Sequence, residues 1–546
     1  MTTTAQEQPT GARRVSRAVA PRSWRRLAIA AALAVAVTVV TAKTGGWWIV
    51  GAPGFSGNLD VARILLFLLL LGGAYWVPAL VRRSSTTARV VFAGWTAYLT
   101  AWIVALWPGI LMTDSVDVVF NSRRGVVYEW FSSLYSLLNI AILDVVPHVA
   151  ALGAVHILLT AGTFAYASSL LARRGAGTAP LVAVNLLAAI SAPVVVTSLL
   201  YSRDTLFGLL HVLLALYVAD AVAVRRSLSR GGLVAVAGLT GALSVLRGDG
   251  LALLIVVPLV LLLLRPGRRA ALAGAGAFAA AALAFHVVLP ATVTIDPKVP
   301  NAYELSLRTN QLGAVLNTDF YSETSEQDLA TLGRVIDVEA FKALSTPVEI
   351  PAYWEGRWNR QATDADFAAF TRVADRLLRD NAGTVLDNRV RTFGATSGLA
   401  PGAFTGAPAG AAAERHDWIA EPAGMTGSPP WPGLYERLAS VLRESSAYRG
   451  VASYRSALQW NLVPWLVLLA AVLLAYRRLR FEALFALIVL SRVPLVFLAA
   501  PAAQFKYYYS VLLAGILLAG FLLARLRTHL SRRPSAARAP VRPAWR

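Results

Sequence analysis

Apolar residues in this chain fall into long runs that alternate with short polar stretches rich in arginine. A helix needs about 20 mostly apolar residues to cross a bilayer. The pattern therefore predicts about twelve membrane-spanning helices. They are expected at residues 25–43, 61–81, 89–111, 148–171, 178–200, 205–224, 231–246, 250–264, 269–290, 457–476, 481–500 and 506–525. The seventh and eighth are short, so residues 231–264 form either two tilted spans or a re-entrant hairpin.

Composition agrees with this pattern. Of the 546 residues, 56% are hydrophobic and only 15% are charged, whereas soluble domains usually have about 25% charged residues. The net charge of +21 would suggest nucleic-acid binding in a soluble protein. Here the basic residues lie between apolar runs, so we expect the chain to contact membrane lipid and not to bind nucleic acid. The absence of cysteine excludes disulfides, thiolate metal sites and cysteine nucleophiles.

The positions of the arginines predict the orientation of the chain, because cytoplasmic loops are enriched in Lys and Arg. If the basic tail 1–24 is cytoplasmic, every second connection holds a basic cluster, and the basic tail 526–546 is cytoplasmic too. The connection clusters are Arg82/Arg83/Arg89, Arg173/Arg174, Arg225/Arg226/Arg230, Arg265/Arg268/Arg269 and Arg477/Arg478/Arg480. We therefore expect a multi-pass membrane protein with both termini in the cytoplasm.

The domain organisation follows from the same pattern. Residues 25–290 are predicted to form a bundle of about nine helices with an external loop at 112–147, and residues 457–525 to add three more helices. Between them, residues 291–456 contain 20 acidic and 16 basic residues. The patterns Ser325-x-x-Asp328 and Thr363-x-x-Asp366 are typical of helix capping boxes. The sequence thus predicts an all-α polytopic protein with one mainly helical external soluble domain.

Two carboxylates follow the third predicted span, in the sequence Pro108-Gly109-Ile110-Leu111-Met112-Thr113-Asp114-Ser115-Val116-Asp117. On a helix, Asp114 and Asp117 would share a face. Such a carboxylate can accept a proton from an attacking hydroxyl, or the pair can hold a divalent cation such as Mg²⁺ or Mn²⁺; otherwise they are solvated acids at a helix start. Glu129 follows in the same loop, before an apolar stretch at 134–146 that we expect at the membrane interface.

Three later external turns carry charges close to the membrane boundary, where unpaired charges are costly. Arg203 and Asp204 lie between two spans, and form either a functional pair or a self-satisfying one. Arg247, in Arg247-Gly248-Asp249-Gly250, is suited to binding phosphate or closes a helical hairpin with its aspartate. Lys506 precedes three tyrosines, and either binds a lipid phosphate or is a snorkelling lysine.

Together these motifs resemble the GT-C class of membrane glycosyltransferases, and in particular uncharacterised bacterial families of that class. The similar elements are Pro108-Gly109 to Asp114-Ser115 in the first loop, Arg203-Asp204-Thr205 in the next turn, and Arg247 to Gly250 in the hairpin. The likeness extends over roughly residues 90–510. The chain departs from the family pattern at 130–133, where Trp-Phe-Ser-Ser replaces a usual His-Pro pair, and at Lys506, where the family usually has Arg and Pro.

The resemblance implies an inverting enzyme of the bacterial plasma membrane that moves a sugar from a polyprenyl-phosphate donor to an extracytoplasmic glycan, lipid or protein. Asp114 would be the catalytic base. Asp117, Asp204 and Glu129 would position the acceptor or a metal ion, and Arg203, Arg247 and Lys506 would bind the donor phosphate. Two alternatives remain open from the sequence. One is a transporter or flippase of a lipid-linked or cell-envelope substrate, and the other is a non-catalytic membrane protein with a GT-C-like fold.

Overall fold

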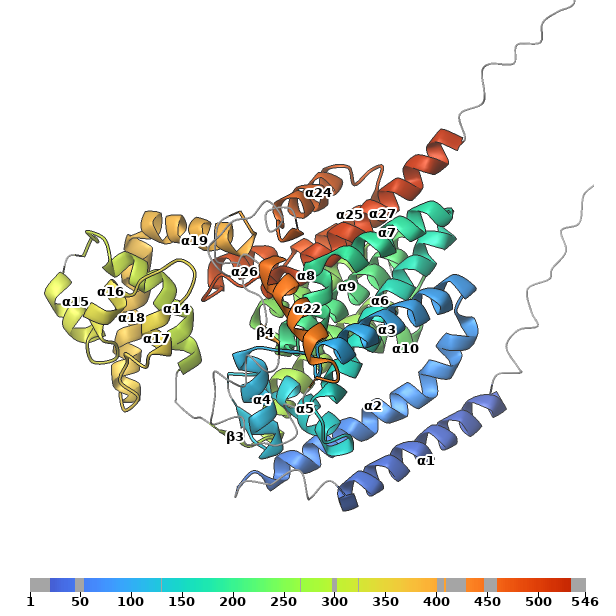
Figure 1. Ribbon diagram of the computed structural model, residues 1–546, viewed down its shortest axis with the longest axis horizontal. Coiled ribbons are helices and arrows are strands. Elements are labelled where there is room, and N and C mark those ends of the chain that lie inside the picture. The colour runs from blue at the N-terminus through green and yellow to red at the C-terminus, as the bar shows by residue number, and fades with distance from the viewer. Residues whose placement is uncertain are drawn as a thin grey trace, which may run out of the picture.

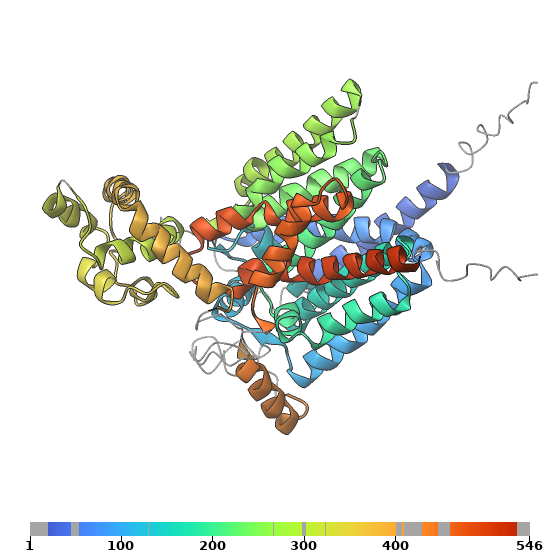
Figure 2. The ribbon, with the colours of Figure 1, turned by 90° about the horizontal axis from the view of Figure 1, so that it is seen from above.

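The computed structural model describes residues 20–44, 54–128, 130–265, 267–296, 302–322, 324–399, 407–408, 429–445 and 459–531. Within these ranges the chain is almost entirely helical and forms a long bundle with a smaller helical domain at one end (Figure 1). The view from above places the domain at the same end of the bundle (Figure 2). The prediction of an all-α fold is confirmed at this level.

Helix α9 (Arg203–Ala223) lies at the centre of the bundle, and 16 of its 21 residues are buried. Its sequence is apolar on all sides, which is expected of a helix that is surrounded by others. Around it pack α6 (Ala150–Arg173), α10 (Arg230–Leu246), α25 (Arg480–Leu490) and α27 (Tyr509–Ser531). The C-terminal helices therefore complete a core that the N-terminal part begins.

Each of the twelve predicted segments coincides with one helix or with two or three consecutive helical elements. Within the described residues, seven helices are long and apolar enough to cross a membrane, and an eighth span results if the bent pair α7 (Thr178–Ile190) and α8 (Ala192–Leu199) is counted as one. The pair bends by 67°. The other predicted segments are shorter apolar helices. Ile64, Val90, Ile190, Ile255 and Leu272 each expose at least 60% of their surface, as expected of an apolar face that meets another apolar phase.

The remaining elements of the bundle complete this arrangement. They are α1 (Ala20–Thr44), α2 (Ser56–Arg83), α3 (Thr86–Ala105), α4 (Thr113–Arg123), α5 (Ser133–Val145), η2 (Gly248–Gly250), α11 (Leu251–Leu262), α12 (Arg268–Leu283), η3 (Ala284–Val288), α13 (Leu289–Thr292), α22 (Pro432–Ser445), α24 (Val463–Leu474), α26 (Val493–Ala499) and η5 (Phe505–Tyr508). Two short strand pairs join distant loops: β1 (Ile110–Leu111) with β4 (Ala407–Pro408), and β2 (Val127–Tyr128) with β3 (Ile295–Asp296).

Two of these helices differ from the sequence-based expectation. Helix α5 was expected at the interface, but nine of its 13 residues are buried and it packs against α2 and α4. Its apolar residues occupy more than one face, so the surrounding helices cover it. Helix α22 belongs to the predicted 291–456 domain, yet it packs against α3 and α8 of the bundle.

Residues 230–262 form a helical hairpin, with α10 and α11 as its arms and η2 at its tip. At a rise of about 1.5 Å per residue, the 12 residues of α11 span roughly 18 Å, well short of the bilayer core of about 30 Å. The tip carries Arg247 and Asp249 into the interior of the protein, where both side chains are largely buried.

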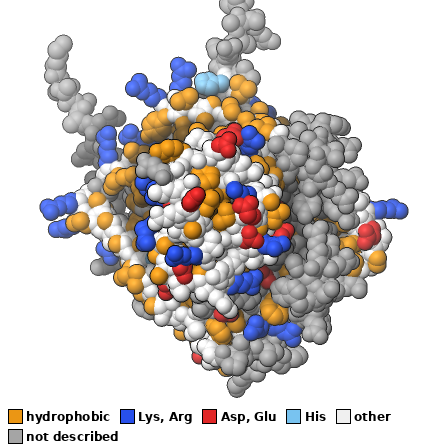
Figure 3. Space-filling view, turned by 90° about the vertical axis from the view of Figure 1, so that its left-hand side faces the viewer, with side chains coloured by type: hydrophobic (Ala, Val, Ile, Leu, Met, Phe, Trp, Pro, Cys, Tyr) orange, Lys and Arg blue, Asp and Glu red, His pale blue; other side chains and the backbone are white. Residues whose placement is uncertain are grey.

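The helical domain has its own hydrophobic core, which includes Leu312, Leu332, Phe370 and Leu377. Its helices are α14 (Ala302–Leu316), α15 (Ser325–Leu332), α16 (Val338–Ala343), α17 (Pro351–Trp354), α18 (Asp364–Asp380) and α19 (Ala382–Thr396). Acidic and basic side chains are interspersed on the face that the domain forms (Figure 3). One such pair is Arg308–Asp375, at 2.7 Å.

The two predicted capping boxes had different outcomes. Thr363 caps α18, and its side chain and that of Asp366 bond reciprocally as predicted. The prediction at Ser325 is wrong, because α15 begins at Ser325 itself and Thr324 precedes it. Asp328 instead accepts hydrogen bonds from Ser322, at 2.5 Å, and from Arg376. The carboxylate of Asp328 is engaged in a tertiary ion pair with Arg376, so it does not form a local capping box with Ser325.

Several predicted cytoplasmic clusters lie together at one end of the bundle. Asp220 pairs with Arg173, Arg174 and Arg226 at 3.7, 3.0 and 3.9 Å. From the C-terminal helices, Arg525 pairs with Glu482 at 3.5 Å. This end also carries the start of α1 and the end of α27, away from the helical domain (Figures 1 and 2).

Candidate active site

A cavity of about 380 Å³ lies where the bundle meets the helical domain. Its polar floor comes from the bundle, and parts of its rim come from α14 and α17 of the domain. Among its lining residues are Asp114, Trp130, Arg203, Asp204, Arg247, Asp249, Tyr303, Trp354, Leu495, Leu498, Gln504, Lys506 and Tyr507. The cavity therefore gathers Asp114, Arg203, Asp204, Arg247 and Lys506, which the sequence proposed as site residues from four separate turns.

Local backbone pairing brings the first two turns together. Ile110 bridges to Leu200, and the amide of Tyr201 donates to the carbonyl of Ile110 at 3.1 Å. Gly109 has a φ of +132°, and a Cβ there would collide with the Tyr201 ring, so this close approach requires glycine. As a result the helices that begin just beyond, α4 and α9, direct Asp114 and Asp204 toward the same cavity.

Lys506 connects the two aspartates. Its ammonium lies 2.9 Å from Asp114 and 3.4 Å from Asp204, and it also contacts the sulfur of Met112 at 3.1 Å. The side chain is 2% exposed, whereas that of Asp114 is 36% exposed. Lys506 is therefore not a snorkelling lysine, because its charge is held inside the protein between two acids. Asp114 keeps an open side toward the cavity.

A second charged group lies beside the first. Arg247 pairs with Asp204 and, at 2.8 Å, with Asp249, while Arg492 donates to the other oxygen of Asp249 at 2.5 Å. The Arg247 guanidinium also lies 4.6 Å from the centre of the Tyr507 ring, a cation–π distance. The predicted Arg–Asp pair at the hairpin tip therefore exists, but it is part of a larger network that reaches Lys506 through Asp204.

Arg203 is the exception among these cations. It donates to the backbone carbonyl of Trp130 at 2.9 Å, and no carboxylate in the described part of the chain lies within 4.0 Å of it. Of the two alternatives for this turn, the self-satisfying Arg203–Asp204 pair is therefore not the one that the structure contains. Arg203 thus lines the cavity with a positive charge that no described carboxylate neutralises in a direct ion pair, which favours an anionic ligand.

The electrostatics keep Asp114 ionised. Burial raises the pKa of its carboxyl, but the charges of Lys506 and Arg203 together outweigh burial, and the pKa lies below its ordinary value of 3.8. Asp114 also lies in the first turn of α4, where the helix dipole favours negative charge. An ionised carboxylate that faces a cavity can accept a proton.

Of the two remaining proposed site residues, the structure describes only one. Asp117 lies one turn further along α4 and is not among the lining residues. Glu129 lies outside the described residues. The sequence reasoning in turn missed Arg492, whose side chain is 3% exposed at the break between α25 and α26. The available signal was an arginine in the middle of the predicted span 481–500, whose other charged residue, Glu482, lies at its start. Such intramembrane charges are usually paired and functional.

The helical domain holds the segment that carries Lys506. Gln311 donates to the carbonyl of Leu498 at 3.1 Å, and the amide of Ala503 donates to the carbonyl of Val348 at 2.8 Å. Arg389 donates to the carbonyl of Ala500 at 2.6 Å. Residues 498–503, which lead into η5, are thus held to the domain at three points.

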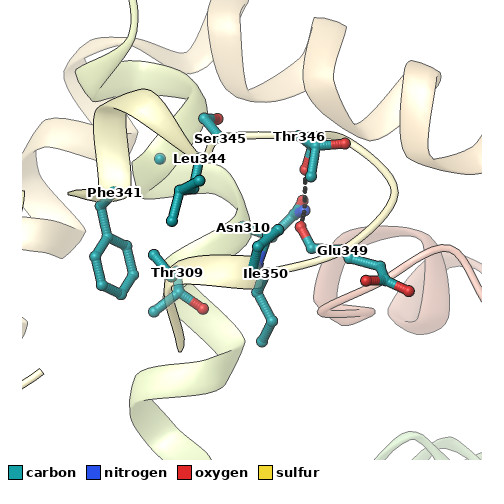
Figure 4. A pocket seen from close by; sticks show the side chains of 11 residues that line it. Thr309, Asn310, Phe341, Leu344, Ser345, Thr346, Glu349 and Ile350 are labelled. Carbon is teal, nitrogen blue, oxygen red and sulfur yellow. Dashed lines mark hydrogen bonds between the residues drawn. The ribbon is translucent and has the colours of Figure 1, made fainter. Parts of the chain in front are cut away.

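Asn310 organises this connection from inside the domain. Its amide nitrogen donates to the carbonyls of Thr346 and Glu349 at 3.1 and 3.4 Å (Figure 4). Its carbonyl oxygen accepts from Asn388 at 2.8 Å and from Arg389. Burial lowers the pKa of Arg389 to about 10, with Tyr508 acting in the opposite direction. Arg389 therefore stays charged at neutral pH.

The carboxylates of the cavity do not form a good site for Mg²⁺ or Mn²⁺. Asp114, Asp204 and Asp249 are each paired with a cationic side chain. The described residues contain no group of three or more His, Asp and Glu side chains that could hold a metal ion. Hard divalent cations need several free oxygen ligands. Among the described residues, the positive charge at this cavity is supplied by Arg and Lys.

Comparisons with known proteins give no relative for this chain. No family model, curated protein or solved structure matches it. The assignment of function therefore depends on the geometry of this cavity and on the motifs that line it.

Proposed function

We propose that the protein is an integral membrane glycosyltransferase of the GT-C type. It would transfer a hexosyl or pentosyl group from a polyprenyl-phosphate donor to a glycan, lipid or protein outside the cytoplasm. The observation that carries this proposal is the meeting of Asp114, Arg203, Arg247 and Lys506 at one cavity. An ionised carboxylate beside several phosphate-binding cations is what an inverting transfer from a sugar phosphate requires.

The proposed topology has about twelve membrane segments, two of which are the short arms of the hairpin at 230–262. Both termini lie in the cytoplasm of a bacterium and residues 291–456 lie outside. Support comes from the basic clusters around Asp220 and Glu482 at one end of the bundle and from the helical domain at the other. Basic residues favour the cytoplasmic side. In this orientation the cavity faces the outer leaflet, where Leu495 and Leu498 of its wall can contact the isoprenoid chain.

In the proposed reaction, the acceptor hydroxyl oxygen forms a bond to the anomeric carbon of the donor sugar from the face opposite the phosphate. The bond between that carbon and the phosphate oxygen breaks, and its electron pair leaves with the polyprenyl phosphate. Asp114 takes the hydroxyl proton. Arg203, Arg247 and Lys506 stabilise the charge that grows on the departing phosphate, which therefore needs no second acid.

In this mechanism the ion pair between Lys506 and Asp114 would regulate how strong a base Asp114 is. While the cavity holds no phosphate, Lys506 neutralises Asp114 at 2.9 Å and weakens it as a base. A donor phosphate would compete for the same ammonium group. Asp114 would become a stronger base when the donor is bound, so that proton transfer is coupled to donor binding.

The test uses purified protein in lipid nanodiscs with radiolabelled polyprenyl-phosphate sugars and a panel of envelope acceptors. Asp114→Asn should lower the rate of transfer by about a hundredfold or more, as expected when a general base is lost. Asp117→Asn is the matched control, because Asp117 lies on the same helix but does not line the cavity. Full transfer by Asp114→Asn, or equal losses in both variants, would rule out Asp114 as the base.

A further inference from the structure

Three aromatic side chains form one side of the cavity, and we call Trp130, Tyr303 and Trp354 the aromatic wall. All three line the cavity. The ring centre of Trp130 lies 5.6 Å from that of Tyr303 and 5.5 Å from that of Trp354, both in edge-to-face arrangements. The three rings come from the first loop, α14 and α17, so folding and not local sequence brings them together.

The aromatic wall is held rigidly but keeps an open face. Trp130 stacks on Tyr353 at 6.0 Å and packs against the hydrophobic cores of both the bundle and the domain. Its carbonyl accepts a hydrogen bond from Arg203 at 2.9 Å. Trp354, in contrast, exposes 52% of its surface. A fixed aromatic group with an exposed neighbour at a cavity is typical of a binding surface.

A polar atom of the same cavity lacks a partner. The side-chain oxygen of Gln504 is buried, and it accepts no hydrogen bond from any residue that the structure describes. Gln504 lines the cavity, and an unpaired buried acceptor is costly unless a ligand satisfies it. The cavity thus offers an aromatic surface, a free acceptor at Gln504 and a partly exposed carboxylate at Asp114.

These features together fit one class of molecule. We propose that the acceptor is a saccharide, which stacks on the aromatic wall and donates one hydroxyl to Gln504. The C–H groups of a pyranose ring carry partial positive charge, and they bind to the negative face of an aromatic ring. Its hydroxyls satisfy the polar groups, and one of them would lie at Asp114. A lipid acyl chain would leave Gln504 unpaired.

This inference rests on the proposed function only in naming the saccharide as the acceptor, and its test needs no donor. The full chain in nanodiscs is applied to an array of mono- to tetrasaccharides, and affinities for the bound sugars are measured by titration. Trp354→Ala should weaken binding about tenfold, and Trp354→Phe should restore most of it. Trp431→Ala is the matched control, because Trp431 is 57% exposed but does not line the cavity.

Gln504→Leu gives a second, independent measurement, and it should weaken binding of the same saccharides. Absence of saccharide binding by the native chain would overturn the inference. So would equal binding by the native chain and Trp354→Ala, or equal losses in Trp354→Ala and Trp431→Ala. If Trp354-dependent binding is found without any sugar transfer, the saccharide-binding site stands, whereas the proposed enzymatic function and the role of the saccharide as its acceptor fail.

Discussion

The replacement of Lys506 by methionine tests the charge arrangement of the cavity most directly. The two side chains have similar length, so Lys506→Met removes the ammonium group with little change in packing. Two carboxylates lose a partner at 2.9 and 3.4 Å. Asp204 retains Arg247, whereas Asp114 loses its only ion pair among the described residues and must rely on the water that reaches its exposed side.

The magnitude follows from the distances. At an effective dielectric constant of about 20, the attractions of Lys506 to Asp114 and Asp204 are roughly 6 and 5 kcal/mol. The desolvation of the buried ammonium, which the variant avoids, offsets part of this. Breaking a buried ion pair by removing one partner usually costs about 3–5 kcal/mol. We therefore expect Lys506→Met to lower the free energy of unfolding by about 3 kcal/mol, the lower end of this range, because Arg247 still neutralises Asp204.

The assay is equilibrium unfolding in mixed micelles, followed by the fluorescence of the native tryptophans. Lys342→Met is the matched control, because Lys342 pairs with Glu339 at 3.3 Å on the surface and should change stability by less than about 1 kcal/mol. Asp114→Asn combined with Lys506→Met should cost clearly less than the sum of the two single changes. The reasoning would be refuted if the losses in unfolding free energy of the two single variants added up to that of the double variant within about 0.5 kcal/mol. It would also be refuted if Lys506→Met and Lys342→Met lowered the unfolding free energy equally.

Three further predictions concern the hairpin, the domain and the response to acid. Gly250→Ala should destabilise the fold by about 1–3 kcal/mol, because a Cβ would collide with the backbone of Leu243; Gly248→Ala, which meets nothing within 4 Å, should be tolerated in the same unfolding assay. Thr363→Ala should cost about 1 kcal/mol for a lost helix cap, whereas Ser325→Ala should cost almost nothing, and equal costs would contradict the observed caps. The pKa of Asp114 lies below 3.8 because Lys506 and Arg203 outweigh its burial, so its charge stabilises the native state above that pH and the stabilisation is lost as pH falls further. Asp114→Asn should therefore flatten the decline in unfolding midpoint between about pH 5 and about pH 2, and an unchanged decline would show that another group is responsible.

Much of the helical architecture was predictable from local pattern. The apolar runs correspond to helices because a chain in an apolar environment must satisfy its backbone hydrogen bonds internally. The central position of α9 follows from a sequence that is apolar on every face. Thr363 marked the start of α18 for a local reason, since its cap involves residues only three positions apart.

Predictions from the local sequence pattern were wrong where a long-range contact was stronger. Ser325 does not cap α15, because Asp328 bonds to Arg376 instead. The apolar face of α5 was expected to meet the membrane, but helices from distant parts of the chain cover it. In both cases the residue type was compatible with the local prediction, and the packing of other elements decided the outcome.

The candidate site shows the same division. The sequence by itself determined that Asp114, Asp204, Arg247 and Lys506 lie at helix ends. Charged residues interrupt apolar runs only where a partner or the membrane boundary offsets the free-energy cost of their desolvation. It could not determine their partners. Lys506 is 392 residues from Asp114 along the chain, and this separation carries no signal of contact.

Only the tertiary structure decided which charges neutralise one another and which remain available. Arg203 and Asp204 are neighbours in sequence, yet α9 directs them to different partners, Trp130 and Arg247. Trp354 and Gln504 are candidate binding residues only because the domain and the last helices line the same cavity, which the sequence does not show. A helix depends on neighbours a few positions away, whereas a site depends on how helices pack, and packing is fixed by the whole chain.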